Sequence, residues 1–323
     1  MGALTNASPA AAIFRGELAP QPPTTGPLVV ATDGSAGCDA AFTAARLFVG
    51  RTNADVQVVT VAEPIFLPSP EWGIVPPTAE MLAARRSRQL SAAREQLARL
   101  VSPDADWQVT AIDGEPASEL ARVASESDAR VMVLGRGRHS LAARALMGET
   151  ASRVLRLADV PVFAAEPTLT KLPSRIVLAT DFSAFSAYAA RVAISLADPR
   201  AVVYLAHVTP RLDLVEPDAP RWAESYERAA RAGMDGVRDA LGLDGMQVEA
   251  VTLTGRPGVA IADFAASTKA DLVVSGTHGW GFFNRLILGS VATDLLHRAP
   301  CSALIVPGAA VRRAEGRQSA PIA

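Results

Sequence analysis

Two closely spaced glycines and a Gly-Ser pair form the part of this sequence with the clearest chemistry. Gly276 and Gly279 follow a short apolar run of β-branched character, which predicts a buried strand. Gly289 and Ser290 come nine residues later and open a segment, 291–298, that is apolar at helical spacing. Glycines let the backbone approach a ligand, and the first amides of a helix can bind an anion. The spacing therefore predicts a phosphate site.

An internal repeat organises the elements that must position these residues. The Ala-Thr-Asp-x-Ser sequence around Asp33 recurs around Asp181, 148 positions later. Gly135 recurs as Gly276 at an offset of 141, and Gly148 recurs at the same offset. Several landmarks in one order indicate a tandem repeat of one unit. The chain of 323 residues is long enough for two such domains.

Each half of the chain alternates predicted strands and helices in the order β-α-β-α-β-α-β-α-β. This alternation predicts a mainly parallel sheet covered on both faces, and right-handed crossovers make it doubly wound. We therefore assign the α/β class, with two doubly wound, parallel, five-stranded, Rossmann-like domains in tandem. Ligands of such sheets bind outside the carboxyl ends of the strands, where the strand order reverses. Asp181 and Gly276 both lie at predicted strand ends.

The division of the chain follows from the repeat and from the composition of its ends. The first 26 residues are rich in Ala, Pro, Thr and Gly, which predicts a flexible arm. The predicted units are an N-terminal arm, 1–26; a first domain, 27–166; a second domain, 174–307; and a C-terminal tail, 308–323.

Composition excludes several classes of function. A hydrophobic share of 49% and a charged share of 20% are typical of a globular protein. The net charge of −2 argues against a nucleic-acid-binding surface. We find no apolar run of the ~18–20 residues that a membrane helix needs, and no secretory signal. Cys38 and Cys301 lack metal-site spacing and are interpreted as buried, reduced thiols. We expect a cytoplasmic protein.

The repeated sequences resemble the universal stress protein family in its tandem form, over nearly all of the chain except its ends. The nucleotide motif of that family is Gly, two residues, Gly, nine residues, Gly and Ser or Thr, and the second half meets it in full. The Ala-Thr-Asp-Phe-Ser strand end and the segment 205–208, Leu-Ala-His-Val, strengthen the match. The resemblance implies an adenine nucleotide α-hydrolase-like fold and ATP as the ligand.

Residue roles follow from the same resemblance. In ATP-binding members the Asp that closes the first strand lies by the ribose and adenine, and a valine at the end of the second strand offers backbone hydrogen bonds to adenine. The glycines and the hydroxyl hold the phosphates, and the Ser290 hydroxyl could also meet Mg²⁺. The implied nucleotide-binding residues are Thr180, Asp181, Val208, Gly276, Thr277, His278, Gly279, Gly289, Ser290 and Val291.

Each of these residues also has an interpretation without a ligand. Asp181 could be a turn former or helix cap, and His278 could be a polar loop residue. His207 ends a strand and is better explained by packing or hydrogen bonding than by catalysis. The glycines could serve a tight turn only. The five arginines of the predicted helix 79–100 are better explained as a solvated face than as an anion surface.

The first half departs from the family motif. Arg138 stands where the second glycine should be, and Glu149 stands in place of the Ser. A carboxylate at a helix N-terminus repels phosphate and satisfies the amides that would hold it. Arg136 and Arg138 could still contact an anion from outside. We therefore predict a degenerate, weaker second site at Asp33, Val61, Gly135 and Gly148.

The sequence supports three functional hypotheses. The first is a cytoplasmic stress-response protein that binds ATP mainly in its second half, with the nucleotide tuning conformation or the binding of a protein partner. The second is a non-nucleotide interaction module built as an intramolecular pseudo-dimer. The third, an adenylate-forming or pyrophosphatase enzyme, lacks a substrate-activating motif. We assign no catalytic residue and expect slow ATP hydrolysis at most.

The resemblance also bears on assembly. Tandem members of the family pack their two domains through the last strands, which here places Phe163 and Leu304 at equivalent apolar positions. A further homodimer is expected because family members commonly assemble that way.

Overall fold

The computed structural model describes residues 19–64, 66–69, 73–136, 150–209, 219–243, 246–277 and 289–318. Residues 150–157 are helical. The remaining elements, in chain order, are β1 (Leu28–Ala31), η2 (Ala36–Cys38), α2 (Asp39–Thr52), β2 (Val56–Ala62), β3 (Leu67–Ser69), β4 (Gly73–Val75), α3 (Ala79–Leu100), β5 (Gln108–Asp113), α4 (Pro116–Glu126), β6 (Val131–Gly135), β7 (Val162–Ala165), β8 (Arg175–Ala179), α6 (Ala184–Leu196), β9 (Val202–Thr209), α7 (Ala219–Leu241), β10 (Gln247–Thr254), α8 (Pro257–Ser267), β11 (Leu272–Gly276), α9 (Ser290–Arg298), β12 (Ser302–Val306) and α10 (Gly308–Gln318).

Helix starts follow local sequence signals. Thr78 caps α3, because its side chain accepts a hydrogen bond from the Met81 amide. Proline occupies the first turn of both α4 and α8, where its missing N–H costs nothing. The Glu115 carboxylate accepts from the Ala117 and Ser118 amides at the start of α4. These signals explain why the predicted helix 79–100 has the bounds of α3.

Ten of the described strands form one sheet in the order β10-β9-β8-β11-β12-β7-β6-β1-β2-β5, and β3 and β4 pair separately in an antiparallel hairpin. When the strands of the large sheet are numbered within each half of the chain, both halves follow the order 3-2-1-4-5, and all of their pairs inside a half are parallel. This is a doubly wound arrangement, as predicted. The order reverses beside the first strand of each half, between β1 and β6 and between β8 and β11.

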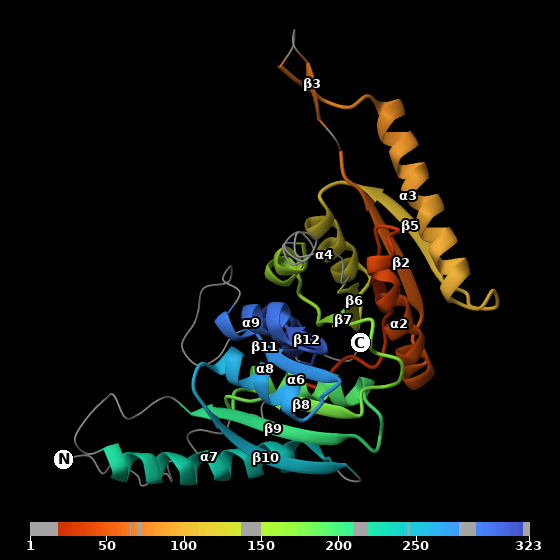
Figure 1. The fold of residues 1–323 in the computed structure, drawn as a ribbon. Helices are drawn as coiled ribbons and strands as arrows, with labels where there is room; N and C mark the ends of the chain where they lie inside the picture. Colours follow the sequence, from red (N-terminus) through yellow and green to blue (C-terminus); the bar gives the residue numbers. More distant parts are fainter. Residues whose placement is uncertain are drawn as a thin grey trace.

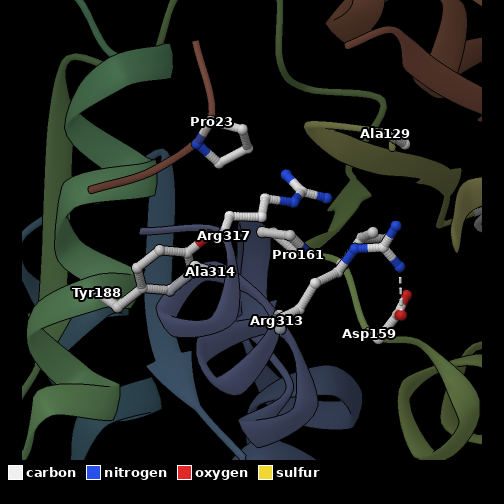
Figure 2. A pocket seen from close by; sticks show the side chains of 10 residues that line it. Pro23, Ala129, Asp159, Pro161, Tyr188, Arg313, Ala314 and Arg317 are labelled. Atoms are coloured by element: carbon white, nitrogen blue, oxygen red, sulfur yellow. Dashed lines mark hydrogen bonds and ion pairs between the residues drawn. The ribbon is translucent and has the colours of Figure 1, made fainter. Parts of the chain in front are cut away.

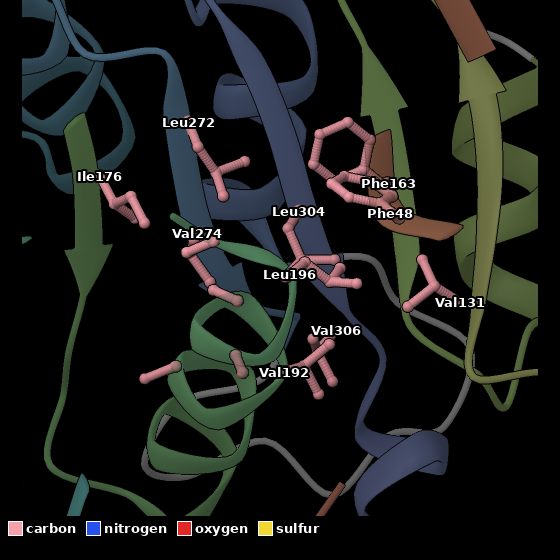
Figure 3. Packing of buried hydrophobic residues seen from close by; sticks show 14 of the residues in the cluster. Phe48, Val131, Phe163, Ile176, Val192, Leu196, Leu272, Val274, Leu304 and Val306 are labelled. Atoms are coloured by element: carbon pink, nitrogen blue, oxygen red, sulfur yellow. The ribbon is translucent and has the colours of Figure 1, made fainter. Parts of the chain in front are cut away.

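The two halves join where β7 and β12 pair in antiparallel register. Leu304 lies opposite Phe163 in this pair, as the tandem arrangement predicted. The Phe163 ring also packs edge-on against Phe48 of α2, with ring centroids 4.8 Å apart (Figure 3). The two five-stranded sheets are therefore continuous, and the apolar core runs through the junction.

Both faces of the sheet are covered by helices. One apolar cluster joins the sheet to α2, α6, α7 and α10, and the other joins it to α4, α8, α9 and the helical residues 150–157. At one end of the molecule α3 and the β3–β4 hairpin extend outward, and α7 and β10 lie at the opposite end (Figure 1). The hairpin lies in the segment between β2 and α3. In the described part of the chain no helix is long and apolar enough to span a membrane.

Segments near both ends of the chain pack on the body formed by the two halves. Ala19 is buried in the core, and the Arg191 guanidinium of α6 donates to the Ala19 and Pro20 carbonyls. At the other end, α10 forms within the segment predicted as a tail, and its Ala310, Val311 and Ala314 are buried. The helix is stable there because this apolar stripe packs on the core.

Arginine side chains from α10 reach the first half of the chain. The Arg313 guanidinium donates to Asp159 (Figure 2). It also donates to Asp128 and to the Ser125 carbonyl near the end of α4. Arg317 adds a hydrogen bond of 2.6 Å to Asp128. Cations near a helix C-terminus stabilise its unpaired carbonyls, so α10 ties α4 to the second half.

Candidate functional site

The carboxyl ends of β9, β8 and β11 bring the predicted site residues to one edge of the sheet. The Thr180 amide, just after β8, donates to the Ala206 carbonyl of β9 at 2.9 Å. On the other side, Leu178 lies opposite Val274 of β11. Asp181, Val208 and Gly276 follow these pairs at the ends of their strands. They border the point where the strand order reverses, the expected position of a ligand crevice.

Asp181 shapes the turn between β8 and α6. Its Oδ1 accepts hydrogen bonds from the Ser183 amide at 3.1 Å and the Ser183 hydroxyl at 2.6 Å. Ser183 in turn caps α6 by accepting from the Ser186 amide at 3.2 Å. The interpretation of Asp181 as a turn former is therefore correct for Oδ1, and this role fixes the carboxylate at the strand edge.

Phe182, between Asp181 and Ser183, was not singled out by the sequence analysis. Its φ is +65°, a left-handed conformation that costs a non-glycine residue about 1–2 kcal/mol. Its buried ring lies on the imidazole of His207, with ring centroids 4.4 Å apart. The packing of this ring offsets the backbone strain and holds the turn in place.

His207 links β8, β9 and α7. Its Nδ1 lies 2.8 Å from the Thr180 carbonyl, and its Nε2 lies 2.7 Å from the Tyr226 hydroxyl. A carbonyl can only accept, so Nδ1 carries the proton and the neutral Nε2 accepts from Tyr226. Burial lowers the pKa of His207, although the Thr180 hydrogen bond and the Asp181 charge act to raise it. The expectation that His207 packs and hydrogen-bonds is confirmed.

Gly289 meets the strand edge so closely that only glycine fits. A Cβ at this position would lie 2.3 Å from the Thr277 carbonyl oxygen, far inside van der Waals contact. Thr277 itself is buried, and its hydroxyl accepts from the Gly308 amide at the start of α10 at 3.1 Å. The Thr277 side chain is therefore engaged with α10, while its carbonyl faces the backbone of Gly289.

Helix α9 begins at this contact. Gly289 is the N-cap residue, and among the described residues no side chain caps the first amides of α9. The first turn contains no acidic residue, Ser290 is exposed and Val291 is half-buried. A tight glycine approach followed by uncapped amides is the donor set that a phosphate group needs. His278 and Gly279 lie outside the described residues.

The weaker site predicted in the first half has a different geometry. Asp33 Oδ1 accepts from the Ser35 amide at 2.8 Å and from the Cys38 thiol at 3.3 Å. A Cβ at Gly135 would lie 2.5 Å from the Gly37 carbonyl oxygen, because η2 packs directly on the end of β6. Burial raises the pKa of Cys38 to about 12, so it is an unreactive thiol. Val61 pairs with Ile112, and Gly148 lies outside the described residues.

Arg136 points away from this first-half crevice. Its guanidinium donates to the carbonyls of Cys301 at 2.8 Å and Ala299 at 3.3 Å, both in the second half. It also forms an ion pair with Glu166, N to O 3.3 Å, in which both side chains are largely buried. The sequence hypothesis that Arg136 contacts an external anion is therefore replaced by a contact between the two halves.

The described residues do not provide a set of side chains that could bind a metal ion. No group of three or more His, Cys, Asp or Glu side chains in this part of the chain could hold an ion. Any Mg²⁺ at the second-half edge would depend on nucleotide phosphates and on a hydroxyl such as that of Ser290.

The fold and this edge define a class of protein: two doubly wound α/β units in tandem, one of which has a glycine-tight helix N-terminus at its switch point. The family model described as "Universal stress protein family" matches residues 25–165 and again 173–307. The chain therefore belongs to the universal stress protein family.

Individual relatives agree with this assignment. The chain is 32% identical to a universal stress protein of Methanocaldococcus jannaschii over 142 residues, covering 42% of this chain and 82% of the relative. It is 27% identical to a universal stress protein of Mycobacterium tuberculosis H37Rv over 289 residues, covering 84% of this chain and 94% of the relative. The second match spans both repeats.

Solved structures share the fold. A universal stress protein from Archaeoglobus fulgidus superimposes with a TM-score of 0.62 at 17% identity, covering 88% of this chain and 97% of that one. A functionally unknown protein from Pseudomonas aeruginosa gives a TM-score of 0.60 at 13% identity, covering 91% and 97%. At these identities the likeness concerns the fold alone.

Proposed function

We propose that this universal stress protein binds ATP at the carboxyl edge of the sheet in its second half. We further propose that the bound nucleotide, alone or with Mg²⁺, tunes the conformation of the protein or its contact with a protein partner during stress. The cytoplasmic location and the homodimer expected from the sequence belong to the same proposal.

The observation that carries the proposal is the contact between Gly289 and Thr277 at the start of α9. The 2.3 Å approach excludes every side chain at position 289, and no side chain of the described residues caps the amides that follow. The first amides of a helix have no acceptor within the helix itself. Phosphate oxygens would satisfy them and would also interact favourably with the helix dipole.

The surroundings fit the rest of a nucleotide. Asp181 and Val208 end the two strands beside the β8–β11 switch point, where the family resemblance assigns ribose and adenine contacts. The carboxylate of Asp181 can accept from ribose hydroxyls, and the backbone of Val208 can pair with adenine. The proposal assigns binding roles to these residues and no catalytic role to any of them.

One observation favours the interaction module as a second candidate. In the first half, η2 packs so closely on Gly135 that a Cβ there would lie 2.5 Å from the Gly37 carbonyl oxygen, which leaves no room for a ligand at this glycine. Arg136 is engaged with the opposite half. A unit built this way is suited to contacts between proteins, so this candidate applies above all to the first half.

Ser290 offers a sharp test because it is exposed and stands at the first position of α9. Ser290→Glu introduces at the second-half helix the residue that the first half has at position 149. A carboxylate there should stabilise the helix by about 0.3–1 kcal/mol, yet repel phosphate and weaken ATP binding at least about tenfold, ~1.4 kcal/mol. Ser290→Gln is the matched control, because glutamine has the size of glutamate but no charge.

Isothermal titration with ATP and thermal unfolding distinguish the outcomes. We expect wild type and Ser290→Gln to bind ATP, and Ser290→Glu to lose binding with no decrease in melting temperature. Wild-type protein that fails to bind ATP at millimolar concentration, with and without Mg²⁺, would overturn the proposal and leave the interaction module as the better account.

A further inference from the structure

The C-terminal end of helix α9 is hydrogen-bonded to Arg136, a residue of the opposite half. Arg136 lies just after β6 in the first half, and its guanidinium donates to the Ala299 carbonyl at 3.3 Å and the Cys301 carbonyl at 2.8 Å. Ala299 is the C-cap residue of α9, and Cys301 is in the turn before β12. One side chain therefore holds the end of the helix and the turn that follows it.

The Arg136 side chain is largely buried, and hydrogen bonds and an ion pair fix both Arg136 and its partner Glu166. The Arg136 side chain is only 13% exposed and that of Glu166 only 5%, and the two form an ion pair of 3.3 Å. The Arg136 amide extends the β6–β7 ladder by donating to the Ala165 carbonyl at 2.7 Å. The Glu166 amide donates to the Ser302 hydroxyl at 3.1 Å in the opposite half. Arg136 is thus fixed to the sheet before its side chain reaches α9.

Helix α9 is short, so a contact at its C-terminal end also affects the position of its N-terminal end. A helix of nine residues is about 14 Å long, and short packed helices move as units. A guanidinium at the C-terminal carbonyls stabilises the helix and fixes its axis. The orientation of the amides after Gly289 therefore depends on what holds Ala299. The position of Arg136 corresponds in the repeat to Thr277, whose hydroxyl binds the start of α10 in its own half.

We propose that Arg136 is a positioning residue through which the first half of the chain sets the nucleotide affinity of the second half, without touching the ligand. This inference rests on the proposed function for its effect on affinity. It gives the first-half loop a role: the arginine that directly follows Gly135 orients the helix that carries the intact motif.

A matched control exists at the same junction. The Arg51 Nε of α2 donates at 3.2 Å to the carbonyl of Ala197, the C-cap residue of α6 in the second half. Arg51 therefore makes the same kind of contact, an arginine on a helix C-cap across the two halves, but on a helix other than α9. Arg136→Met and Arg51→Met each remove a guanidinium that crosses between the halves to a helix C-cap, largely buried at Arg136 and exposed at Arg51. Arg136→Lys retains a cation that can reach fewer acceptors.

Two measurements on the full chain test the proposal. Hydrogen exchange of nucleotide-free protein reports on the amides of residues 291–298, and titration with ATP reports on affinity. We expect Arg136→Met to accelerate exchange within α9 selectively and to weaken ATP binding several-fold. Arg136→Lys should recover part of both effects, and Arg51→Met should change neither.

Other outcomes overturn the inference. Unchanged exchange in α9, or acceleration spread equally over the whole sheet, would show that Arg136 only stabilises the junction. Selective acceleration with unchanged ATP affinity would remove the coupling to nucleotide. If wild type itself does not bind ATP, the proposed function and the effect on affinity both fail, while the exchange of α9 still decides whether Arg136 positions that helix.

Discussion

The ring of Phe182 lies so close to the backbone of Gly233 in α7 that a Cβ on this glycine would come within 2.9 Å of the ring. In the first half the sizes of the two contacting residues are reversed, with the small residue in the turn and the larger one on the helix. Gly34 stands at the position of Phe182, also in a left-handed conformation with φ +81°, and Ala92 of α3 stands at the position of Gly233. A Cβ at Gly34 would lie 2.7 Å from the Ala92 Cβ. One small and one larger residue fill each turn-to-helix contact.

We predict that the effect of Gly233→Ala changes sign with the residue at 182. With Phe182 present the added methyl overpacks a buried ring, and we expect a loss of about 1–2 kcal/mol in unfolding free energy. In a Phe182→Gly background the same change should gain about 0.5–1 kcal/mol, because alanine is the better helix former.

Urea unfolding of the four proteins in a double-mutant cycle measures the coupling, which we expect to exceed about 1 kcal/mol. The Phe182→Gly variant itself should lose about 1–4 kcal/mol, because removal of the ring costs about 3–5 kcal/mol and glycine relieves about 1–2 kcal/mol of left-handed backbone strain. Additive effects of the two substitutions would contradict the steric account and mean that the helix shifts freely to accommodate the methyl group.

His207 predicts a dependence of stability on acidity. Burial lowers its folded pKa below the ordinary value of 6.5, so between these values the unfolded chain takes up a proton that the folded protein does not. Stability should therefore be independent of this group above pH 6.5 and fall below it, by at most ~1.4 kcal/mol per pH unit. Protonation would also place a donor at Nε2, where the neutral ring accepts from Tyr226.

The check is chemical denaturation of wild type and His207→Asn between pH 7.5 and pH 5. The variant should start less stable, because the Tyr226 contact is lost, but its stability should decline less with acid. His297→Asn, at an exposed position of α9, is the control and should behave as wild type. Parallel pH profiles for wild type and His207→Asn would refute the assignment.

The parts of the structure that local patterns control were predicted from the sequence. Strand runs and the helix 79–100 follow from periodicity and capping residues. The strand-edge position of Asp181 follows from the same signals, because a parallel sheet brings equivalent strand ends together. The meeting of the two halves through the strands of Phe163 and Leu304 follows from the resemblance to tandem family members.

Contacts between distant residues were not predicted. Arg136 and Cys301 are 165 positions apart, and no local pattern distinguishes an arginine that crosses a junction from one that awaits an anion. The Thr277 side chain is a similar case, because its partner Gly308 starts a helix in a segment whose composition indicated a tail. The contact of η2 with Gly135 depends on a backbone approach between distant residues that only the packed fold creates.

The final prediction concerns the tie between α10 and α4. Arg313 hydrogen-bonds to Asp128, and this contact is the main cause that lowers the pKa of the Asp128 carboxyl below its ordinary value of 3.8. Because the folded pKa is the lower one, the contribution to stability is present above about pH 4 and is lost as the pH falls through the folded value. Asp128 is largely exposed, so solvent screening keeps this contribution small.

Arg313→Gln should therefore lower the unfolding free energy by about 1 kcal/mol at pH 7, mainly through the lost bonds to Asp159 and to the Ser125 carbonyl. The part of the difference that comes from Asp128 should be lost below pH 4, as the Asp128 carboxyl becomes protonated. Arg122→Gln is the matched control, because Arg122 pairs with Glu119 and Glu126 within α4 on an exposed surface, where ion pairs contribute little, and we expect a smaller loss. Equal losses in the two variants would mean that α10 does not hold the two halves together.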